Sequence, residues 1–175
     1  MRKYFYTIFL SIFTLQGMAQ LCQGSLGDPI VNINFGAGSN PGAPLAAAAT
    51  GYIYQTADCP NDGFYTVRNI TGECFGNTWH VLNQDHTGNG NGYFMLVNAS
   101  VQPSTFYIDS VRGLCGNITF EFAAWIMNVV LPTACGNNSN QPNITFTIEK
   151  TDGTILQSYN SGNISTTDIP LWRQY

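Results

Sequence analysis

Strict alternation of apolar and polar residues is the feature that most restricts how this 175-residue chain can fold. Apolar side chains occupy every second position in residues 31–35, 118–126 and 144–149. Successive side chains of a β-strand point to opposite faces of its sheet, so this period of two predicts half-buried strands. No sustained helical period occurs after the first twenty residues, and the short alanine run 46–49 cannot nucleate a helix alone.

Further strand candidates are apolar or aromatic runs separated by turn residues. They cover residues 51–55, 64–69, 79–82, 93–97 and 105–110. Asn61-Asp62-Gly63 predicts a hairpin turn between the first two runs, and residues 150–153 predict another between 144–149 and 154–160. Eight or nine short strands with such turns are typical of an all-β, two-sheet antiparallel sandwich.

The first nineteen residues have the form of a secretory signal. Residues 1–3 are cationic, 4–15 are mostly apolar, and 17–19 are small enough for a cleavage site, so we expect cleavage after residue 19 and one domain over residues 20–175. The apolar run is too short to span a bilayer. A lipid anchor at Cys22 is the alternative, but bulky Leu21 precedes it where a small residue is expected.

The charge of the exported part excludes nucleic acid as a partner. Once the signal has left, only four basic side chains remain against ten acidic ones, which gives a net charge of −6. These basic residues are Arg68, Arg112, Lys150 and Arg173. Such a chain has no basic stripe that could release counterions from phosphates.

All five cysteines lie in residues 20–175, which indicates an oxidising compartment. Five thiols cannot all pair, and several two-bridge arrangements are open. We favour Cys59–Cys74 and Cys115–Cys135, because each closes a short excursion between predicted strands. Cys22 would then be free, or paired with a residue beyond Tyr175. No C-x-x-C pair occurs, which disfavours a thiolate metal site.

Candidate catalytic residues are scarce. Only His80 and His86 could act as a base near neutral pH, and neither lies in a zinc-protease or nucleophile-elbow pattern. A glycosidase would need two carboxylates flanking the sugar bond, whereas Glu121 stands alone on its strand. We therefore predict that the chain is not an enzyme.

After catalysis, calcium binding is the second function considered, and residues 85–92 are its candidate site. This segment is rich in oxygen donors, and its glycines allow the backbone to wrap tightly round an ion. We expect Asp85, Asn89 and Asn91 as ligands, with Asp28, ahead of the first strand, as another. The closing glutamate of an EF-hand is missing, and an ordinary polar turn explains the same residues.

Ligand binding is the third possibility. Flat side chains beside hydrogen-bonding groups are the mixture that sugar sites use. The candidates are Trp79, His80, Asp85, His86, Tyr93 and Trp125. The alternative is that Trp79 and Tyr93 are core aromatics of neighbouring strands. In 118–126 the face with Phe122 is predicted to be core, so Trp125 lies on the outer face, where it either packs beneath a loop or contacts a ligand.

The same stretch resembles a known family. Trp79, followed by Asp85-His86-Thr87 and by Gly92-Tyr93-Phe94-Met95, resembles the W…DHT…G-x-Y-M signature of MAM-type adhesion domains, which are jelly-roll β-sandwiches at cell surfaces. Residues 24–36, 85–100 and 120–126 are similar to the N-terminal domains of large exported proteins of Bacteroidota. Those proteins often end in a gliding-motility-associated or type IX secretion sorting domain.

This resemblance implies a jelly roll that is displayed at the cell surface and contacts a glycan or a protein. The cysteine pattern of eukaryotic MAM domains is not matched, which leaves the disulfide pairing open. The closing strand that the family carries is absent after Tyr175, so we expect a jelly roll truncated at its C-terminus. The function that we predict is an exported surface binding or adhesion module, part of a larger protein. The alternative is a non-catalytic carbohydrate-binding domain attached to a secreted hydrolase.

Overall fold

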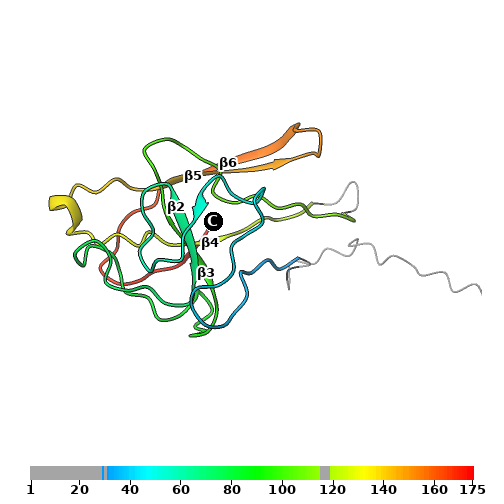
Figure 1. Cartoon of the computed structure of the whole chain (residues 1–175). Helices are drawn as coiled ribbons and strands as arrows, with labels where there is room; N and C mark the ends of the chain where they lie inside the picture. Colours follow the sequence, from blue (N-terminus) through cyan, green and yellow to red (C-terminus); the bar gives the residue numbers. More distant parts are fainter. Residues whose placement is uncertain (1–28, 30, 115–118) are drawn as a thin grey trace, which may run out of the picture. The chain divides into compact units, whose positions relative to one another are not determined.

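The structure is a computed structural model that describes residues 29, 31–114 and 119–175. The expected signal 1–19, Cys22 and Asp28 lie outside the described residues. The elements are β1 (Ile53–Tyr54), β2 (Phe64–Arg68), β3 (Phe94–Asn98), β4 (Trp125–Ile126), the 3-10 turn η1 (Ala134–Gly136), β5 (Asn143–Glu149), β6 (Ile155–Asn163) and β7 (Arg173–Gln174) (Figure 1). The all-β prediction is confirmed for the described residues.

The chain divides into two compact units. One comprises residues 1–30 and 111–120, and the other comprises Val31–Ser110 and Glu121–Tyr175. Every element named above belongs to the second unit. No helix in the part of the chain that the structure describes has the length and apolar character needed to cross a membrane.

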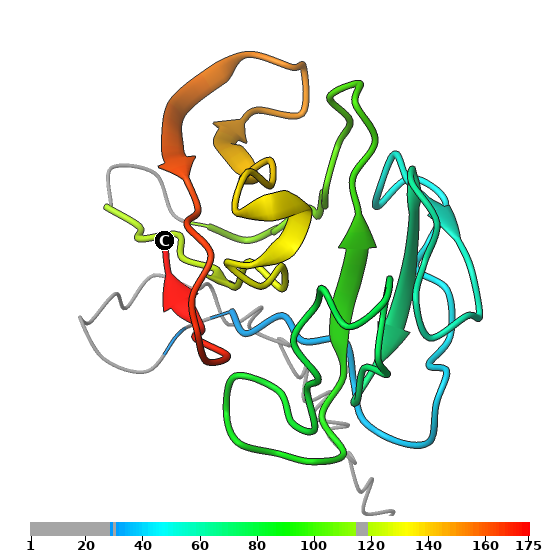
Figure 2. The same ribbon diagram turned by 90° about the vertical axis from the view of Figure 1, so that its left-hand side faces the viewer.

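β2 and β3 form the centre of this second unit. They pair antiparallel, with Thr66 opposite Leu96 and Val67 opposite Met95, and both strands are largely buried. Figure 2 shows the pair as two green arrows side by side. β1 pairs with the other edge of β2, which gives a three-stranded sheet in the order β1-β2-β3.

The predicted hairpin between the first two strands is wrong. β1 and β2 run parallel, with Ile53 opposite Phe64. After β1 the chain continues to the far end of β2, where Asp58 pairs with Arg68, and only then returns to begin β2. The Asn-Asp-Gly turn therefore ends this return path and does not join two antiparallel strands.

Alternate residues of the central sheet face two different cores. Tyr65, Val67 and Met95 form one buried cluster. On the opposite face Phe94 and Leu96 pack with Cys74, Trp79 and Leu82, and we call this second group the Trp79 cluster. Successive side chains of β2 and β3 point to opposite faces of the sheet, and both faces are covered. Apolar side chains of these strands are therefore buried on each side of the sheet.

Extended segments without strand pairing cover the Trp79 cluster. The backbone N–H of His80 donates to the carbonyl of Val129 at 2.7 Å, and that of Leu131 donates to Thr78 at 2.8 Å. The expected strand 79–82 contributes only an isolated bridge between Trp79 and Val130. The expected strands 31–35 and 105–110 do not form either. Side-chain packing and scattered hydrogen bonds replace regular ladders in these segments.

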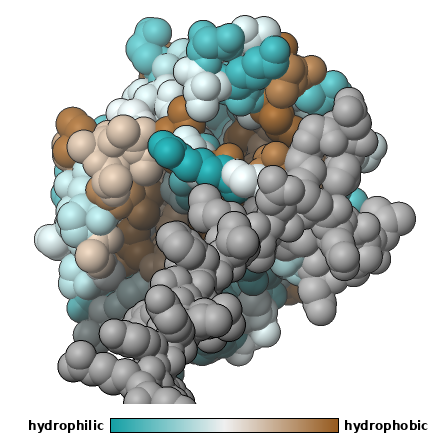
Figure 3. Space-filling view, turned by 90° about the vertical axis from the view of Figure 1, so that its right-hand side faces the viewer, coloured by the Kyte–Doolittle hydropathy of each residue, from teal (hydrophilic) through white to brown (hydrophobic). Residues whose placement is uncertain are grey.

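The predicted β5–β6 hairpin is confirmed, and Gly153 in its turn donates to the carbonyl of Lys150 at 2.9 Å. The ring of Phe146 stacks on that of Tyr159 with planes at 24°, and it contacts the ring of Phe122 at a tilt of 56°. The expectation that Phe122 lies in the core is wrong, because its side chain is 57% exposed. Among the described residues 119–126, only Trp125–Ile126 form a strand, so no ladder in this range holds Phe122 over a core. The side of the molecule that faces the viewer in Figure 3 likewise has apolar residues at its surface, gathered round a hollow.

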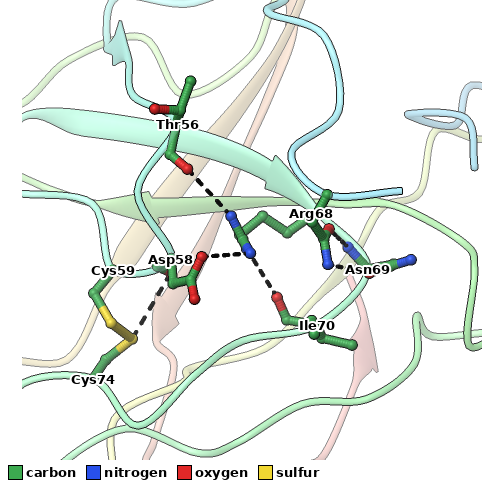
Figure 4. A network of polar contacts seen from close by, with 8 residues as sticks. Thr56, Asp58, Cys59, Arg68, Asn69, Ile70 and Cys74 are labelled. Carbon is green, nitrogen blue, oxygen red and sulfur yellow. Dashed lines mark hydrogen bonds and ion pairs between the residues drawn. A yellow bond between two sulfur atoms is a disulfide. The ribbon is translucent and has the colours of Figure 1, made fainter. Parts of the chain in front are cut away.

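A disulfide and an ion pair fasten the path between β1 and β2 (Figure 4). The predicted Cys59–Cys74 bridge is confirmed, with Cα atoms 5.4 Å apart. The Arg68 side chain is 6% exposed, and its guanidinium lies 2.5 Å from a carboxylate oxygen of Asp58. Arg68 also donates to the carbonyls of Ile70 at 3.1 Å and Thr56 at 3.3 Å. Burial of its charge is tolerated because each of these partners compensates for lost water.

The second predicted bridge is not found. Cys135 carries a free, exposed thiol in η1, and Cys115 lies outside the described residues. Cys135 has a left-handed backbone with φ of 51° and is followed by Gly136 and Asn137, also left-handed. This tight turn places the thiol in solvent.

Removing the confirmed bridge should destabilise the fold. Its cysteines are 15 residues apart, so chain-entropy arguments give a loss of about 3 kcal/mol for the Cys59→Ala, Cys74→Ala double variant. Urea denaturation measures this free energy. Cys135→Ala is the control and should leave the unfolding midpoint unchanged. A double variant as stable as the wild type would contradict the role assigned to the bridge.

Two buried threonines should respond in opposite directions to the same substitution. The Thr66 hydroxyl is buried without a hydrogen-bond partner among the described residues. The Thr71 hydroxyl donates to the carbonyl of His80 at 3.0 Å and accepts from the N–H of Leu82 at 2.8 Å. Thr66→Val should therefore raise the free energy of unfolding by about 1 kcal/mol, and Thr71→Val should lower it by about 1–3 kcal/mol. Urea denaturation measures both, and equal losses would contradict the different roles assigned to the two hydroxyl groups.

Candidate functional site

A rigid loop before β3 is organised by one carboxylate. Oδ1 of Asp85 accepts hydrogen bonds from the N–H of Thr87 at 2.8 Å, the Thr87 hydroxyl at 2.6 Å and the N–H of Asn89 at 3.0 Å. The other side of the carboxyl group lies against Gly92, where a Cβ would be 2.6 Å from the Asp85 Cγ. Three donors and a glycine together fix the loop, since the short Asp side chain replaces backbone partners in a turn.

These contacts set the acidity of Asp85. Partial burial by itself would raise the pKa of the carboxyl group. The hydrogen bonds from Thr87 and Asn89, together with the nearby imidazole of His86, outweigh burial and lower the pKa below its ordinary value. The carboxylate is therefore ionised and committed to partners inside the loop.

The loop presents His86 to two tryptophans from the C-terminal half of the chain. The imidazole stacks on the indole of Trp125, with centroids 5.3 Å apart and planes at 21°. Trp172 meets the same imidazole edge-on at 6.2 Å. Figure 2 shows the green loop beside the red C-terminal segment that supplies Trp172. We call His86, Trp125 and Trp172 the aromatic face.

Strand register decides what surrounds the aromatic face. β4 and β7 pair antiparallel with Trp125 opposite Gln174 and Ile126 opposite Arg173. Opposite residues of an antiparallel pair share one side of the sheet. Gln174 therefore lies beside Trp125, whereas the Arg173 guanidinium belongs to the other side. The half-exposed Trp125 thus has an amide neighbour and no cationic one on this pair of strands.

Trp172 joins this face to the core and to a groove. It packs on the Trp79 cluster, with its ring 6.1 Å from that of Phe94. It also lines an open groove of about 330 Å³, together with Val81, Leu82, Asn83, Gln84, Ile169 and Pro170. Apolar side chains and two amides therefore share one depression, a combination that fits ligands with both apolar faces and hydroxyl groups.

Two of the expected ligand residues are buried. Trp79 belongs to the core, as the alternative of a core aromatic predicted. His80 is 5% exposed, and its Nε2 lies 2.9 Å from the carbonyl oxygen of Thr167. A carbonyl oxygen only accepts, so Nε2 carries the proton and donates it. Neither residue presents a stacking face to a ligand at the surface.

Tyr93 also faces away from the loop. Its ring packs against the Tyr65 and Val67 cluster, and its hydroxyl donates to the carbonyl of Ser39. Its N–H donates to the carbonyl of Gly36 at 2.9 Å. Tyr93 therefore anchors the end of the loop. Of the six expected ligand residues, the structure brings together His86 and Trp125, with Asp85 as the support of His86.

Two of the expected calcium ligands, Asp85 and Asn89, accept hydrogen bonds within the loop. Oδ1 of Asn89 accepts from the N–H of Asn91 at 2.9 Å, and Asp85 has the donors described above. Asp28 lies outside the described residues. In the part of the chain that the structure describes, no three His, Cys, Asp or Glu side chains gather as a metal site. Calcium binding stays a prediction.

Trp172 and Gln174 were not among the residues that the sequence singled out for binding. They follow a polar segment and lie on or beside a strand of two residues, so no alternation marks them. Their role comes from pairing with β4, which is distant in the sequence.

Comparison with known proteins adds no assignment: no family model, no curated protein and no solved structure matches this chain. The resemblance to MAM-type and Bacteroidota surface domains therefore stays a prediction.

The depressed pKa of Asp85 predicts a pH dependence of stability. The unfolded carboxyl group titrates near 3.8 and the folded one at lower pH, so the stabilisation is present above pH 3.8 and is lost as pH falls through the folded pKa. Asp85→Asn removes this contribution. The difference in free energy of unfolding between wild type and Asp85→Asn, measured in urea, should therefore shrink between about pH 5 and pH 2. A difference that stays constant over this range would contradict it.

Proposed function

We propose that this chain is an exported binding or adhesion module of a bacterial cell surface, and that its ligand contacts the aromatic face and the adjoining groove. The observation that carries the proposal is the exposure of stacked aromatic rings beside the groove. Trp125 is 46% exposed although His86 covers part of it. Large aromatic side chains left accessible beside a depression are typical of binding surfaces.

The proposed export follows from the sequence. The signal-like residues 1–19 and the five cysteines after them support secretion, and the confirmed Cys59–Cys74 bridge fits an oxidising compartment. A low content of charged residues, 9% of the chain, leaves Asn, Thr, Ser and Gln to keep the surface hydrated.

We further propose that the fold is a jelly-roll sandwich. Burial of both faces of the β1-β2-β3 sheet supports a layered arrangement. A second layer would consist of the segments that cover the Trp79 cluster. Hydrogen bonds of His80 and Leu82 with neighbouring segments, and of the Asn128 amide with the carbonyl of Ile164 at 2.8 Å, support this layer.

The proposal does not include catalysis. His80 donates its Nε2 proton to a carbonyl, and His86 is stacked against an indole. Both histidines therefore have structural partners in place of a nucleophile or a substrate. That the chain is not an enzyme stays a prediction.

The amides of the groove favour one alternative. Asn83 and Gln84 beside apolar side chains would also suit a non-catalytic carbohydrate-binding domain attached to a secreted hydrolase. The complete reading frame distinguishes the two, because a catalytic domain would indicate the alternative and a sorting domain would indicate the surface module.

Retention on solid ligands tests the proposed function. We expect the purified chain to bind to at least one of cellulose, chitin, β-1,3-glucan, collagen-coated beads or casein-coated beads, with bound protein measured by gel densitometry. Val81→Asp places a charge on an exposed groove residue and should reduce retention about tenfold, equivalent to about 1.4 kcal/mol.

Tyr159→Ala is the matched control, since Tyr159 is an exposed aromatic residue of the β5–β6 hairpin, and it should bind like the wild type. No retention on any surface, or retention that Val81→Asp leaves intact, would overturn the proposed function.

A further inference from the structure

We propose that the ligand of the aromatic face is an uncharged oligosaccharide, with sugar rings stacked on Trp125 and Trp172 and hydroxyl groups bound by the amides of Gln174, Asn83 and Gln84. This inference rests on the proposed function and names the chemical class of its ligand. It follows from stacking area, from the kind of polar group at the site and from the absence of a fixed charge on the stacking side of the β4–β7 pair.

The indoles of Trp125 and Trp172, which both contact the imidazole of His86, provide the stacking area. His86 covers one side of Trp125 nearly parallel to it, so the exposed 46% of Trp125 comes from its remaining face and edges. Trp172 lies against the same imidazole and opens into the groove. The two indoles are thus close enough to contact adjoining units of one oligosaccharide. Flat apolar faces of this kind suit the C–H side of a sugar ring.

The polar groups near these rings are amides. Gln174 lies opposite Trp125 across the β4–β7 pair, and Asn83 and Gln84 line the groove beside Trp172. An amide both donates and accepts hydrogen bonds, so it can satisfy a sugar hydroxyl, which also does both.

The charges at the site disfavour an acidic ligand. Arg173 lies on the other side of the β4–β7 pair from Trp125, and the Asp85 carboxylate is bound within its own loop. The exported chain as a whole has a net charge of −6, which repels acidic polysaccharides. Burial of an anion against the indoles would therefore be uncompensated, whereas burial of an uncharged ring is not penalised in this way.

The site is also preorganised. Three hydrogen bonds to Asp85 hold the loop that carries His86, and Trp172 packs on Phe94 in the core. Side chains that are already held in place lose little conformational entropy when a ligand binds. The second exposed aromatic group, Phe122, Phe146 and Tyr159, packs without this support from the core and serves as the comparison.

Isothermal titration calorimetry with defined hexasaccharides tests the inference. The neutral probes are cellohexaose, laminarihexaose and mannohexaose, and the charged probe is hexaguluronate. We expect at least one neutral probe to bind and hexaguluronate not to bind. Trp125→Ala should weaken binding at least tenfold, and Gln174→Ala should weaken it severalfold. Tyr159→Ala is the control for loss of an exposed aromatic and should bind like the wild type.

Circular dichroism verifies folding of each variant, and Trp125→Phe, which retains an aromatic ring, should recover part of the affinity lost in Trp125→Ala. Retention on protein-coated beads that depends on Val81, without binding of any neutral hexasaccharide, would overturn this inference and leave the proposed function in place. Binding of hexaguluronate as tight as that of the neutral probes would overturn it too. Absence of both retention and hexasaccharide binding would overturn the two together.

Discussion

The fold depends on the antiparallel pairing of β2 with β3. Both strands are five residues long, and each places neighbouring side chains in different cores. A shift of one residue in the register would exchange the two sets of side chains, so packing on both faces specifies one pairing. Phe94 then contacts Trp172, and Trp172 contacts His86. The aromatic face is in this sense an outward continuation of the Trp79 cluster, positioned by the same five-residue ladder.

The loop before β3 shows how a polar segment becomes rigid without regular structure. Asp85 satisfies three donors, Gly92 leaves room for its carboxyl group, and Tyr93 ties the loop to the neighbouring segment. The side-chain oxygens of Asp85 and Asn89 therefore accept hydrogen bonds from the loop itself. Their arrangement serves to hold an imidazole against an indole. In this way the sequence D-H-T-G has a structural explanation that is independent of a metal.

Local patterns predicted the parts of the fold that local contacts determine. The β5–β6 hairpin and the Cys59–Cys74 bridge join residues close in sequence, and β2 and β3 have dense apolar runs. The parallel pairing of β1 could not be read in this way, because contacts such as that of Asp58 with Arg68, which accompany the return path to β2, leave no mark in a local pattern. Only part of the candidate site was predicted, because local patterns do not show contacts between segments that are distant in the sequence. His86 and Trp125 stand out as a loop histidine and an outward tryptophan, whereas Trp172 and Gln174 acquire their places only through pairing with a strand far away in the chain.

The three tryptophans occupy three kinds of surroundings: Trp79 is in the interior, Trp172 lies at its boundary, and Trp125 is in contact with water. Their emission spectra should differ accordingly, since an indole in water emits at longer wavelength than one in an apolar environment. The native molecule consequently contains its own optical reporters, one for the integrity of the interior and two for events at the surface.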